Sequence, residues 1–412
     1  MQKQLNWKYS GSQALNSGLL AAMLSFASIF MLDKGFTNST IGIILAFSNV
    51  LSIAIQTFFA NYTNRNKSVK LQDMLTVLLL VVMISSAALL FIPSFFIFLL
   101  SAILAFSFVQ SSTPFVNSLA FIYEEEGIHI KFGIARGFGS LSYALVTLLL
   151  GFVIEKTTSS ILPVFYIGLA FIFILIIRSY KLPKDEMFEE EAIDQDEQDM
   201  TRQRESVPVE EQSLVSFLNE YRELVYIIIG LGFVLFAQTM INTFLINIVT
   251  PLGGDSSAVG LAIFIAAAVE IPIMMNFDGL VKKRSTAFWL KLSAIFFVAK
   301  VVLMFFATNL TMIYISQFLQ FGSYALAYPA AVQYIKNRVR EKDLFKGQTL
   351  FTIGITASNV FASFLGGMLT DSLGTAGMVF VALFATIVGG FIIVRVLGDV
   401  PSEAYEVAKS ES

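Results

Sequence analysis

The sequence predicts an all-α membrane protein with twelve transmembrane helices in two pseudo-symmetric bundles of six. Hydrophobic residues make up 56% of the 412-residue chain, 41 of them phenylalanine, whereas a soluble domain is typically about 45 to 50% apolar. Apolar stretches of roughly 20 residues, the length that crosses about 30 Å of hydrocarbon, recur along the chain. Helices are expected because a helix satisfies its own backbone hydrogen bonds where no water can.

The first stretch lacks a short apolar core followed by a small-residue cleavage site, so it is interpreted as a retained span rather than a signal peptide. The twelve predicted spans are residues 9–31, 38–61, 71–91, 94–121, 133–154, 160–179, 222–249, 256–280, 286–306, 309–334, 345–369 and 374–398.

The distribution of basic residues predicts the orientation in the membrane, because Lys and Arg concentrate in cytoplasmic loops. The loops on one side hold only Lys34 and Lys156. We therefore expect both termini and the central segment to be cytoplasmic, in a multi-pass protein of the cell membrane. The basic residues of the predicted cytoplasmic loops are Arg65, Lys67, Lys70, Lys131, Lys282, Lys283, Arg284, Lys336, Arg338, Arg340, Lys342 and Lys346.

A charged segment separates the two halves. Between Leu182 and Glu211 there are twelve acidic and three basic residues, a composition typical of a self-repelling tether. The predicted organisation is an N-terminal six-helix bundle at 1–180, an acidic cytoplasmic linker at 181–221, a C-terminal bundle at 222–398 and a cytoplasmic tail at 399–412. A regulatory role for the linker is an open alternative to a plain solvated tether.

The two halves resemble each other weakly at their fifth helices. When FGIARGFGSLSYALVTLLLGFVIEKTTS is aligned with KGQTLFTIGITASNVFASFLGGMLTDSLG, Gly151 and Glu155 fall opposite Gly367 and Asp371. This duplication of six helices resembles that of the major facilitator superfamily, and the resemblance implies a substrate site at the midplane between the halves, reached by alternating access as one bundle rocks against the other.

A closer resemblance begins at FGIARGFG, residues 132–139, which is similar to a motif of the lactose permease family, the oligosaccharide:proton symporters of the major facilitator superfamily. VEIPIM around Glu270, FVAKVV around Lys300 and the Leu319–Gln320 pair also resemble that family's helices 8, 9 and 10. The resemblance implies the major facilitator fold. It also implies a secondary active transporter of a small hydroxylated solute, a sugar, oligosaccharide or glycoside, with a proton as coupling ion.

The same resemblance implies roles for individual residues. Arg136 matches an arginine that binds sugar hydroxyls, a task suited to a planar fork of donors, and Tyr143 matches an aromatic residue that stacks on the sugar ring. Glu270 matches a carboxylate in sugar binding and coupling, and Lys300 keeps the helix 9 positive charge. Asn117 lies where the family has a helix 4 carboxylate.

At helix 10, Gln320 and Ser323 replace the family's histidine and the glutamate associated with the proton, which leaves Glu270 as the intramembrane proton carrier. A carboxylate within a membrane helix costs at least about 3 kcal/mol on insertion scales and indicates function. One hypothesis is that Lys300, or a substrate cation, approaches and leaves Glu270 as the halves rock, and so loads and releases a proton. The alternative is a static buried ion pair joining helices 8 and 9.

Other polar residues are weaker candidates for the substrate site. Asn16, Asn117, Gln320 and Tyr324 are candidate substrate ligands, and interhelical hydrogen bonding is the alternative for each. Gln317, Gln320, Tyr324 and Tyr328 are spaced to share one face of a continuous helix.

Arg136 has an alternative interpretation as a snorkelling anchor near a helix end. The glycines at 133, 137 and 139 instead predict close helix packing beside it.

The residue inventory argues against other classes of protein. There is no cysteine and one histidine, and no metal-spacing cluster or phosphate-binding glycine loop, so no enzyme, cofactor or metal site is predicted. A receptor or scaffold would not need a repeat with buried ionisable groups. No nucleic-acid partner is expected, and nothing requires more than a monomer in the bilayer. The open alternative is an efflux transporter of sugars, nucleosides or amphipathic drugs. An exporter of amphipathic drugs would have a roomy aromatic cavity that is indifferent to Arg136.

Overall fold

The computed structural model describes residues 2–65, 69–92, 94–125, 128, 130–180, 214–340 and 343–398. Most of the predicted linker and all of the predicted tail lie outside the described residues. The end of the predicted linker differs from a tether, because residues 214–220 form the short helix α9. This helix is held by the fully buried ring of Phe217.

The first half of the chain forms six spans. The opening span is made of α1 and α2, which are separated by a two-residue turn. The elements are α1 (Gln2–Leu24), α2 (Ala27–Asp33), α3 (Asn38–Arg65), α4 (Leu71–Phe91), α5 (Phe95–Glu125), α6 (Phe132–Lys156), η1 (Ser159–Ile161) and α7 (Leu162–Arg178).

The second half also forms six spans. Two of them run together as α17, which turns at Gly374 with a φ of 71°, a conformation that favours glycine. The elements are α9 (Leu214–Glu220), α10 (Arg222–Thr243), α11 (Leu245–Val249), η3 (Thr250–Leu252), α12 (Ser256–Met275), α13 (Phe277–Val281), α14 (Thr286–Phe305), α15 (Leu310–Phe318), η4 (Leu319–Phe321), α16 (Tyr324–Arg338) and α17 (Leu344–Gly398).

The predicted all-α membrane fold is confirmed. Ten helical stretches of the described chain are long and apolar enough to cross a membrane, and one of them, Lys346–Leu397, holds both spans of α17. The interrupted helix α15–η4–α16 supplies the remaining crossing. This interruption is a difference from the sequence analysis, which expected a continuous helix over 309–334.

Side-chain caps fix the starts of three helices in the second half. Asp255 accepts hydrogen bonds from the main-chain N–H groups of Ser257 and Ala258 at the start of α12. Ser285 and Asn309 do the same for α14 and α15. The hydrogen bond from the Ser257 hydroxyl, with those from the main chain, holds the pKa of Asp255 below its ordinary value. The cap is therefore charged at neutral pH and complements the helix dipole.

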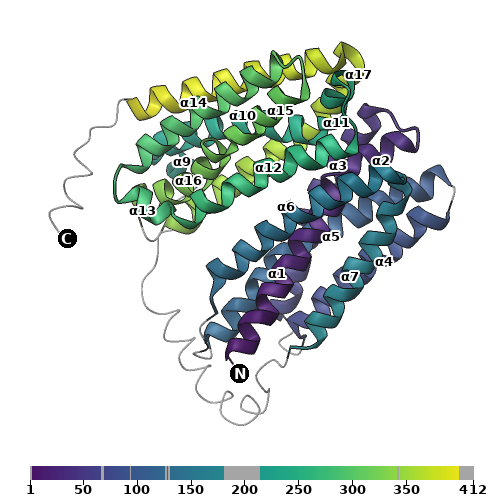
Figure 1. Cartoon of the computed structure of the whole chain (residues 1–412). Helices are drawn as coiled ribbons and strands as arrows, with labels where there is room; N and C mark the ends of the chain where they lie inside the picture. Colours follow the sequence, from purple (N-terminus) through teal and green to yellow (C-terminus); the bar gives the residue numbers. More distant parts are fainter. Residues whose placement is uncertain are drawn as a thin grey trace, which may run out of the picture.

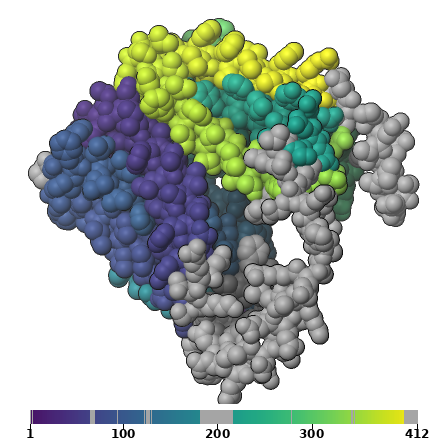
Figure 2. Space-filling view, turned by 180° about the vertical axis from the view of Figure 1, so that it is seen from behind, coloured from purple at the N-terminus to yellow at the C-terminus, as the bar shows by residue number. Residues whose placement is uncertain are grey.

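The two bundles meet at one end of the molecule and diverge toward the other (Figure 1). We call the first the closed end, which includes α2, α11 and the turn of α17, and the second the open end, where α1 begins and α13 lies. The main contacts between the bundles are made by two helix pairs, α3 with α17 and α6 with α12. Figure 2 shows the first pair from behind, with α3 in purple beside the yellow-green half of α17.

Glycines allow the backbones to approach closely at the closed end. A Cβ on Gly260 of α12 would lie 2.5 Å from the Thr147 carbonyl oxygen and 2.9 Å from the Cα of Gly151 on α6. A Cβ on Gly42 of α3 would collide with the Ser363 carbonyl oxygen on α17. Small residues are the usual solution where membrane helices pack without a hydrophobic driving force.

Candidate functional site

A bridged charge pair lies at the centre of the second bundle. The Lys300 ammonium on α14 donates a hydrogen bond to Gln320 Oε1 in η4, and Gln320 Nε2 donates to Glu270 Oε1 on α12 at 2.7 Å. Lys300 and Gln320 are buried, each 3% exposed. An ammonium can only donate and a carboxylate can only accept, so the two charged groups set the orientation of the amide. We call these three residues the Glu270–Gln320–Lys300 bridge.

The bridge bears on two expectations from the sequence. Glu270 and Lys300 were expected to pair directly, but the Gln320 side chain lies between them. All three residues also belong to the same bundle, so a rocking motion of one bundle against the other does not separate Lys300 from Glu270. Separation of Lys300 from Glu270 would therefore need a movement within the second bundle, and this version of the hypothesis stays a prediction.

The break in helix 10 positions this amide. The chain changes from α-helix to 3₁₀-helix at Leu319, and side chains three residues apart eclipse in a 3₁₀-helix. Gln317 and Ser323 have buried polar atoms with no hydrogen-bond partner in the described chain. The four-residue face expected for Gln317, Gln320, Tyr324 and Tyr328 is thus divided, with the two glutamines buried in the bundle and the two tyrosine rings 5.9 Å apart beyond the break.

Residues of the first bundle lie opposite Glu270. Tyr143 on α6 interacts electrostatically with Glu270, and its hydroxyl shares a 2.9 Å hydrogen bond with Ser25. Tyr324 on α16 interacts electrostatically with Glu270, Tyr143 and Arg136. The structure therefore brings together Arg136, Tyr143, Glu270 and Tyr324 from both bundles, along with the bridge.

Arg136 is exposed and lies near the start of α6. The packing argument made for its glycine neighbours holds for one of the three. A Cβ on Gly139 would lie 2.7 Å from the Ser17 hydroxyl, whereas Gly133 and Gly137 have no atoms within 4 Å of that position. The link between Arg136 and the site is its interaction with Tyr324 of the other bundle.

Asn16 and Asn117 lie within the first bundle, at the contact of α1 with α5. Asn16 Nδ2 donates to the Thr113 hydroxyl at 3.1 Å and its Oδ1 accepts from Ser112 at 2.6 Å. Asn117 Oδ1 accepts from Gln13 at 2.9 Å. Both side chains thus tie α1 to α5, as the interhelical alternative expects, and Asn16 is only 1% exposed.

The sequence analysis missed a polar junction between the bundles at the closed end. Asp371 on α17 accepts from the main-chain N–H groups of Asn38 and Ser39 at the start of α3, at 3.3 and 2.6 Å, and from the Asn38 side chain at 2.9 Å. Asn247 on α11 donates to Asn38 Oδ1 at 2.6 Å. The alignment of Asp371 with Glu155 was the available signal, but it did not show that one carboxylate caps a helix of the other bundle.

Two bundles of membrane helices, with ionisable and aromatic groups gathered between them, define a multi-span membrane transporter. The chain belongs to the MFS_1 like family, whose model matches residues 6–382, and so to the major facilitator superfamily. It is 25% identical over 378 residues to the uncharacterized transporter YwbF of Bacillus subtilis (strain 168), a match that covers 87% of this chain and 86% of that protein. It is 22% identical over 380 residues to a maltose permease of Geobacillus stearothermophilus, covering 90% and 89%.

Solved structures agree with this assignment of the fold. The nucleoside transporter NupG superposes with a TM-score of 0.72 at 12% identity, over 96% of this chain and 100% of that chain. A D-xylose-proton symporter superposes with a TM-score of 0.68 at 14% identity, over 96% and 97%. The predicted superfamily, and the prediction that the chain is a transporter and not an enzyme, are confirmed.

Proposed function

We propose that this transporter moves a sugar, oligosaccharide or glycoside across the cell membrane together with a proton. The observation that supports the proposal is the grouping of Tyr143 and Tyr324 around Glu270, with Arg136 interacting with Tyr324. Aromatic faces and a planar guanidinium suit the apolar ring face and the hydroxyl groups of a sugar. The similarity to a maltose permease supports the same substrate class.

Glu270 is the proposed proton carrier. Its Oε1 is held by Gln320, while Tyr143 of the first bundle interacts with it electrostatically. Because the Glu270–Gln320–Lys300 bridge moves with its own bundle, only the groups contributed by the first bundle change when the bundles rock. The carboxyl group then exchanges a proton with whichever side of the membrane the site is open to.

The proposed orientation places the open end and both termini in the cytoplasm. The basic loops predicted to be cytoplasmic include Lys131 at the start of α6 and Lys282, Lys283 and Arg284 after α13, and both segments lie toward the open end (Figure 1). Positive loops favour the cytoplasmic side. The conformation is therefore proposed to be open to the cytoplasm, in a protein that acts as a monomer.

Transient alkalinisation of lightly buffered cells tests the proposal. Cells expressing the protein are given maltose, xylose, other glycosides and nucleosides one at a time, with Arg136→Lys as the test variant. Arg178→Lys is the matched control, because Arg178 pairs with Asp73 at 2.5 Å on helices α7 and α4, away from the site. A sugar that alkalinises the medium in the parent and the control, and not in Arg136→Lys, is the expected result.

Two other outcomes contradict the proposal. Sugar uptake without a pH change would mean an uncoupled carrier. If no compound of the panel alkalinises the medium and one of them leaves preloaded vesicles, the alternative of an exporter of sugars, nucleosides or amphipathic drugs is favoured.

A further inference from the structure

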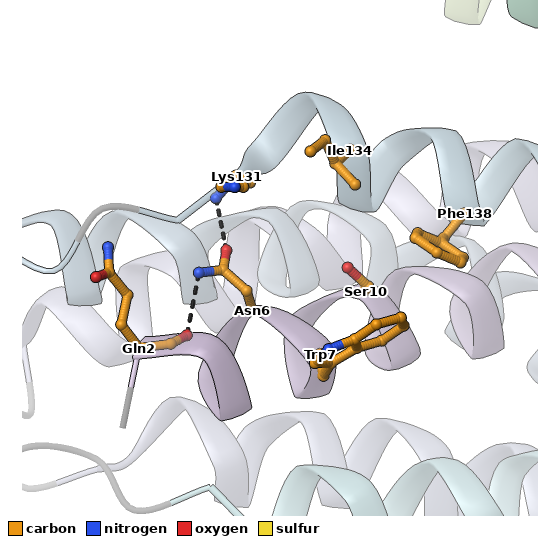
Figure 3. A pocket seen from close by; sticks show the side chains of 7 residues that line it. All are labelled: Gln2, Asn6, Trp7, Ser10, Lys131, Ile134 and Phe138. Atoms are coloured by element: carbon orange, nitrogen blue, oxygen red, sulfur yellow. Dashed lines mark hydrogen bonds between the residues drawn. The ribbon is translucent and has the colours of Figure 1, made fainter.

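A pocket of about 380 Å³ lies between α1 and α6 near the open end, outside the site described above. Figure 3 shows its floor, where the Lys131 main-chain N–H donates to Asn6 Oδ1 at 2.7 Å and Asn6 Nδ2 donates to the Gln2 carbonyl oxygen at 3.1 Å. The remaining walls are Trp7, Ser10, Ile134 and Phe138. The pocket is thus polar at one end and apolar at the other.

The pocket faces away from the centre of the first bundle. Asn16 on α1 turns inward to α5, and Trp7 precedes it by nine residues, which is about 180° around a helix. The Trp7 side chain is 61% exposed. On α6, exposed apolar residues recur at helical spacing from the pocket toward the C-terminal end of the helix. They form a stripe typical of a lipid-facing surface: Ile134, Phe138, Leu141, Leu145 and Leu149.

The polar end of the pocket is cationic. Lys131 is exposed and immediately precedes α6 as its N-cap residue, and its side chain makes no cap hydrogen bond. A lysine at the positive end of a helix dipole favours an anion such as a phosphate group. At the other end, Trp7 and Phe138 meet edge to face with ring centroids 5.8 Å apart, in the position where aromatic residues anchor proteins at the membrane interface.

We propose that this pocket docks an anionic phospholipid, with its phosphate at Lys131 and one acyl chain along Trp7, Ile134 and Phe138. The occupant must carry a negative group and an apolar chain together, because the cation and the exposed aromatic wall belong to one pocket that is continuous with the lipid-facing stripe. The proposed cytoplasmic orientation of the open end makes this a lipid of the inner leaflet, where anionic lipids attract basic residues.

Tryptophan fluorescence gives a direct test, because the chain has two tryptophans. The Trp289→Phe variant leaves Trp7 as the reporter, reconstituted in phosphatidylcholine vesicles with brominated phosphatidylglycerol or brominated phosphatidylcholine as quencher. We expect phosphatidylglycerol to associate with Trp7 about fivefold more strongly than phosphatidylcholine. The Lys131→Gln variant should bring this ratio to about one.

Lys8→Gln is the matched control. Lys8 follows Trp7 directly but donates to the Ser179 carbonyl oxygen at 2.5 Å beside α7, so its loss should leave the ratio unchanged. If Trp289→Phe folds poorly, subtracting the signal of Trp7→Phe from that of the parent protein isolates the same reporter.

Three results would overturn the proposal: equal quenching by both lipids in the parent, no quenching by either, or an equal loss of preference in Lys8→Gln and Lys131→Gln. The last would mean a general effect of positive charge. No substrate is present in this assay, so its failure is separate from failure of the proposed sugar transport.

Discussion

The carboxylate of Asp371 caps a helix that belongs to the opposite bundle. Its two oxygens accept the main-chain N–H groups of Asn38 and Ser39, the first residues of α3. These N–H groups have no partner within their own helix, and α3 begins without an acidic residue in its first turn. The cap exists only while the closed end is closed, so its energy contributes to the equilibrium between conformations.

Removing this cap should open the closed end. A carboxylate at an exposed helix N-terminus contributes about 0.3 to 1 kcal/mol, so Asp371→Asn should raise the population of the other conformation about two- to fivefold. The chain has no cysteine, and Ser363→Cys at the α3–α17 contact, where the serine is 2% exposed, gives a clean maleimide-labelling site. Its labelling rate should rise by the same factor.

Glu155→Gln is the control for that measurement. Glu155 falls opposite Asp371 in the internal repeat and is exposed, and no hydrogen bond joins it to α12 in the described chain. Asp255 caps α12 from within its own segment instead. We therefore expect the labelling rate to rise in Asp371→Asn and not in Glu155→Gln. An equal rise in both variants would contradict the role given to Asp371.

A side chain at Gly260 should prevent the bundles from closing. The Cβ of Gly260→Val would meet backbone atoms of Thr147 and Gly151 at 2.5 and 2.9 Å, and backbone cannot move aside as a flexible side chain can. Labelling at Ser363→Cys should increase more than in Asp371→Asn. Gly168→Val on α7, where no atom lies within 4 Å of the Cβ position, should leave the rate at the parent level. Unchanged labelling in Gly260→Val would mean that this contact does not limit opening.

The Glu270–Gln320–Lys300 bridge should behave as one energetic unit. Lys300→Met leaves Glu270 without its cation, and Glu270→Gln leaves a buried ammonium facing two amides. Because contacting residues are not additive, the double variant should be more stable than the sum of the single losses by about 1 to 3 kcal/mol. Thermal unfolding of the parent, the two single variants and the double variant in detergent measures this coupling energy. Additive losses of stability would show that Glu270 and Lys300 do not interact.

Transport assays should separate coupling from recognition at the same residue. Glu270→Gln should lose proton-driven accumulation of the sugar while retaining exchange between the two sides. The amide oxygen still accepts a hydrogen bond from Gln320, but the amide has no titratable proton to transport. Exchange and uptake are measured on one vesicle preparation over a range of pH. Accumulation equal to that of the parent at every pH would exclude Glu270 as the proton carrier.

Arg136→Lys should weaken substrate binding by at least tenfold with little change in stability. The guanidinium is exposed, so its replacement should alter the free energy of unfolding by no more than about 0.5 kcal/mol. A lysine keeps the charge and loses the bidentate fork. Substrate-dependent thermal stabilisation measures both quantities, and unchanged affinity would favour the snorkelling-anchor interpretation of Arg136.

Much of the architecture followed from the sequence because bilayer physics constrains it strongly. Apolar length determines the number of spans, and backbone hydrogen bonding requires that they be helices. Glu270 and Lys300 also stood out in the sequence, since charged residues inside apolar stretches are rare. The break in helix 10 was missed because apolar length does not distinguish a continuous helix from α15, η4 and α16 in succession.

The membrane class, the two-bundle fold and the charged groups within it could be predicted from the sequence, because each depends on composition and spacing along one chain. Three features depend on how the helices pack: Gln320 separates Glu270 from Lys300, Asn16 and Asn117 join α1 to α5, and Asp371 caps the start of α3, at Asn38, in the other bundle. These contacts join residues up to 333 positions apart. Which polar group meets which depends on how the packed helices are rotated and shifted, and hydrophobic periodicity does not specify this.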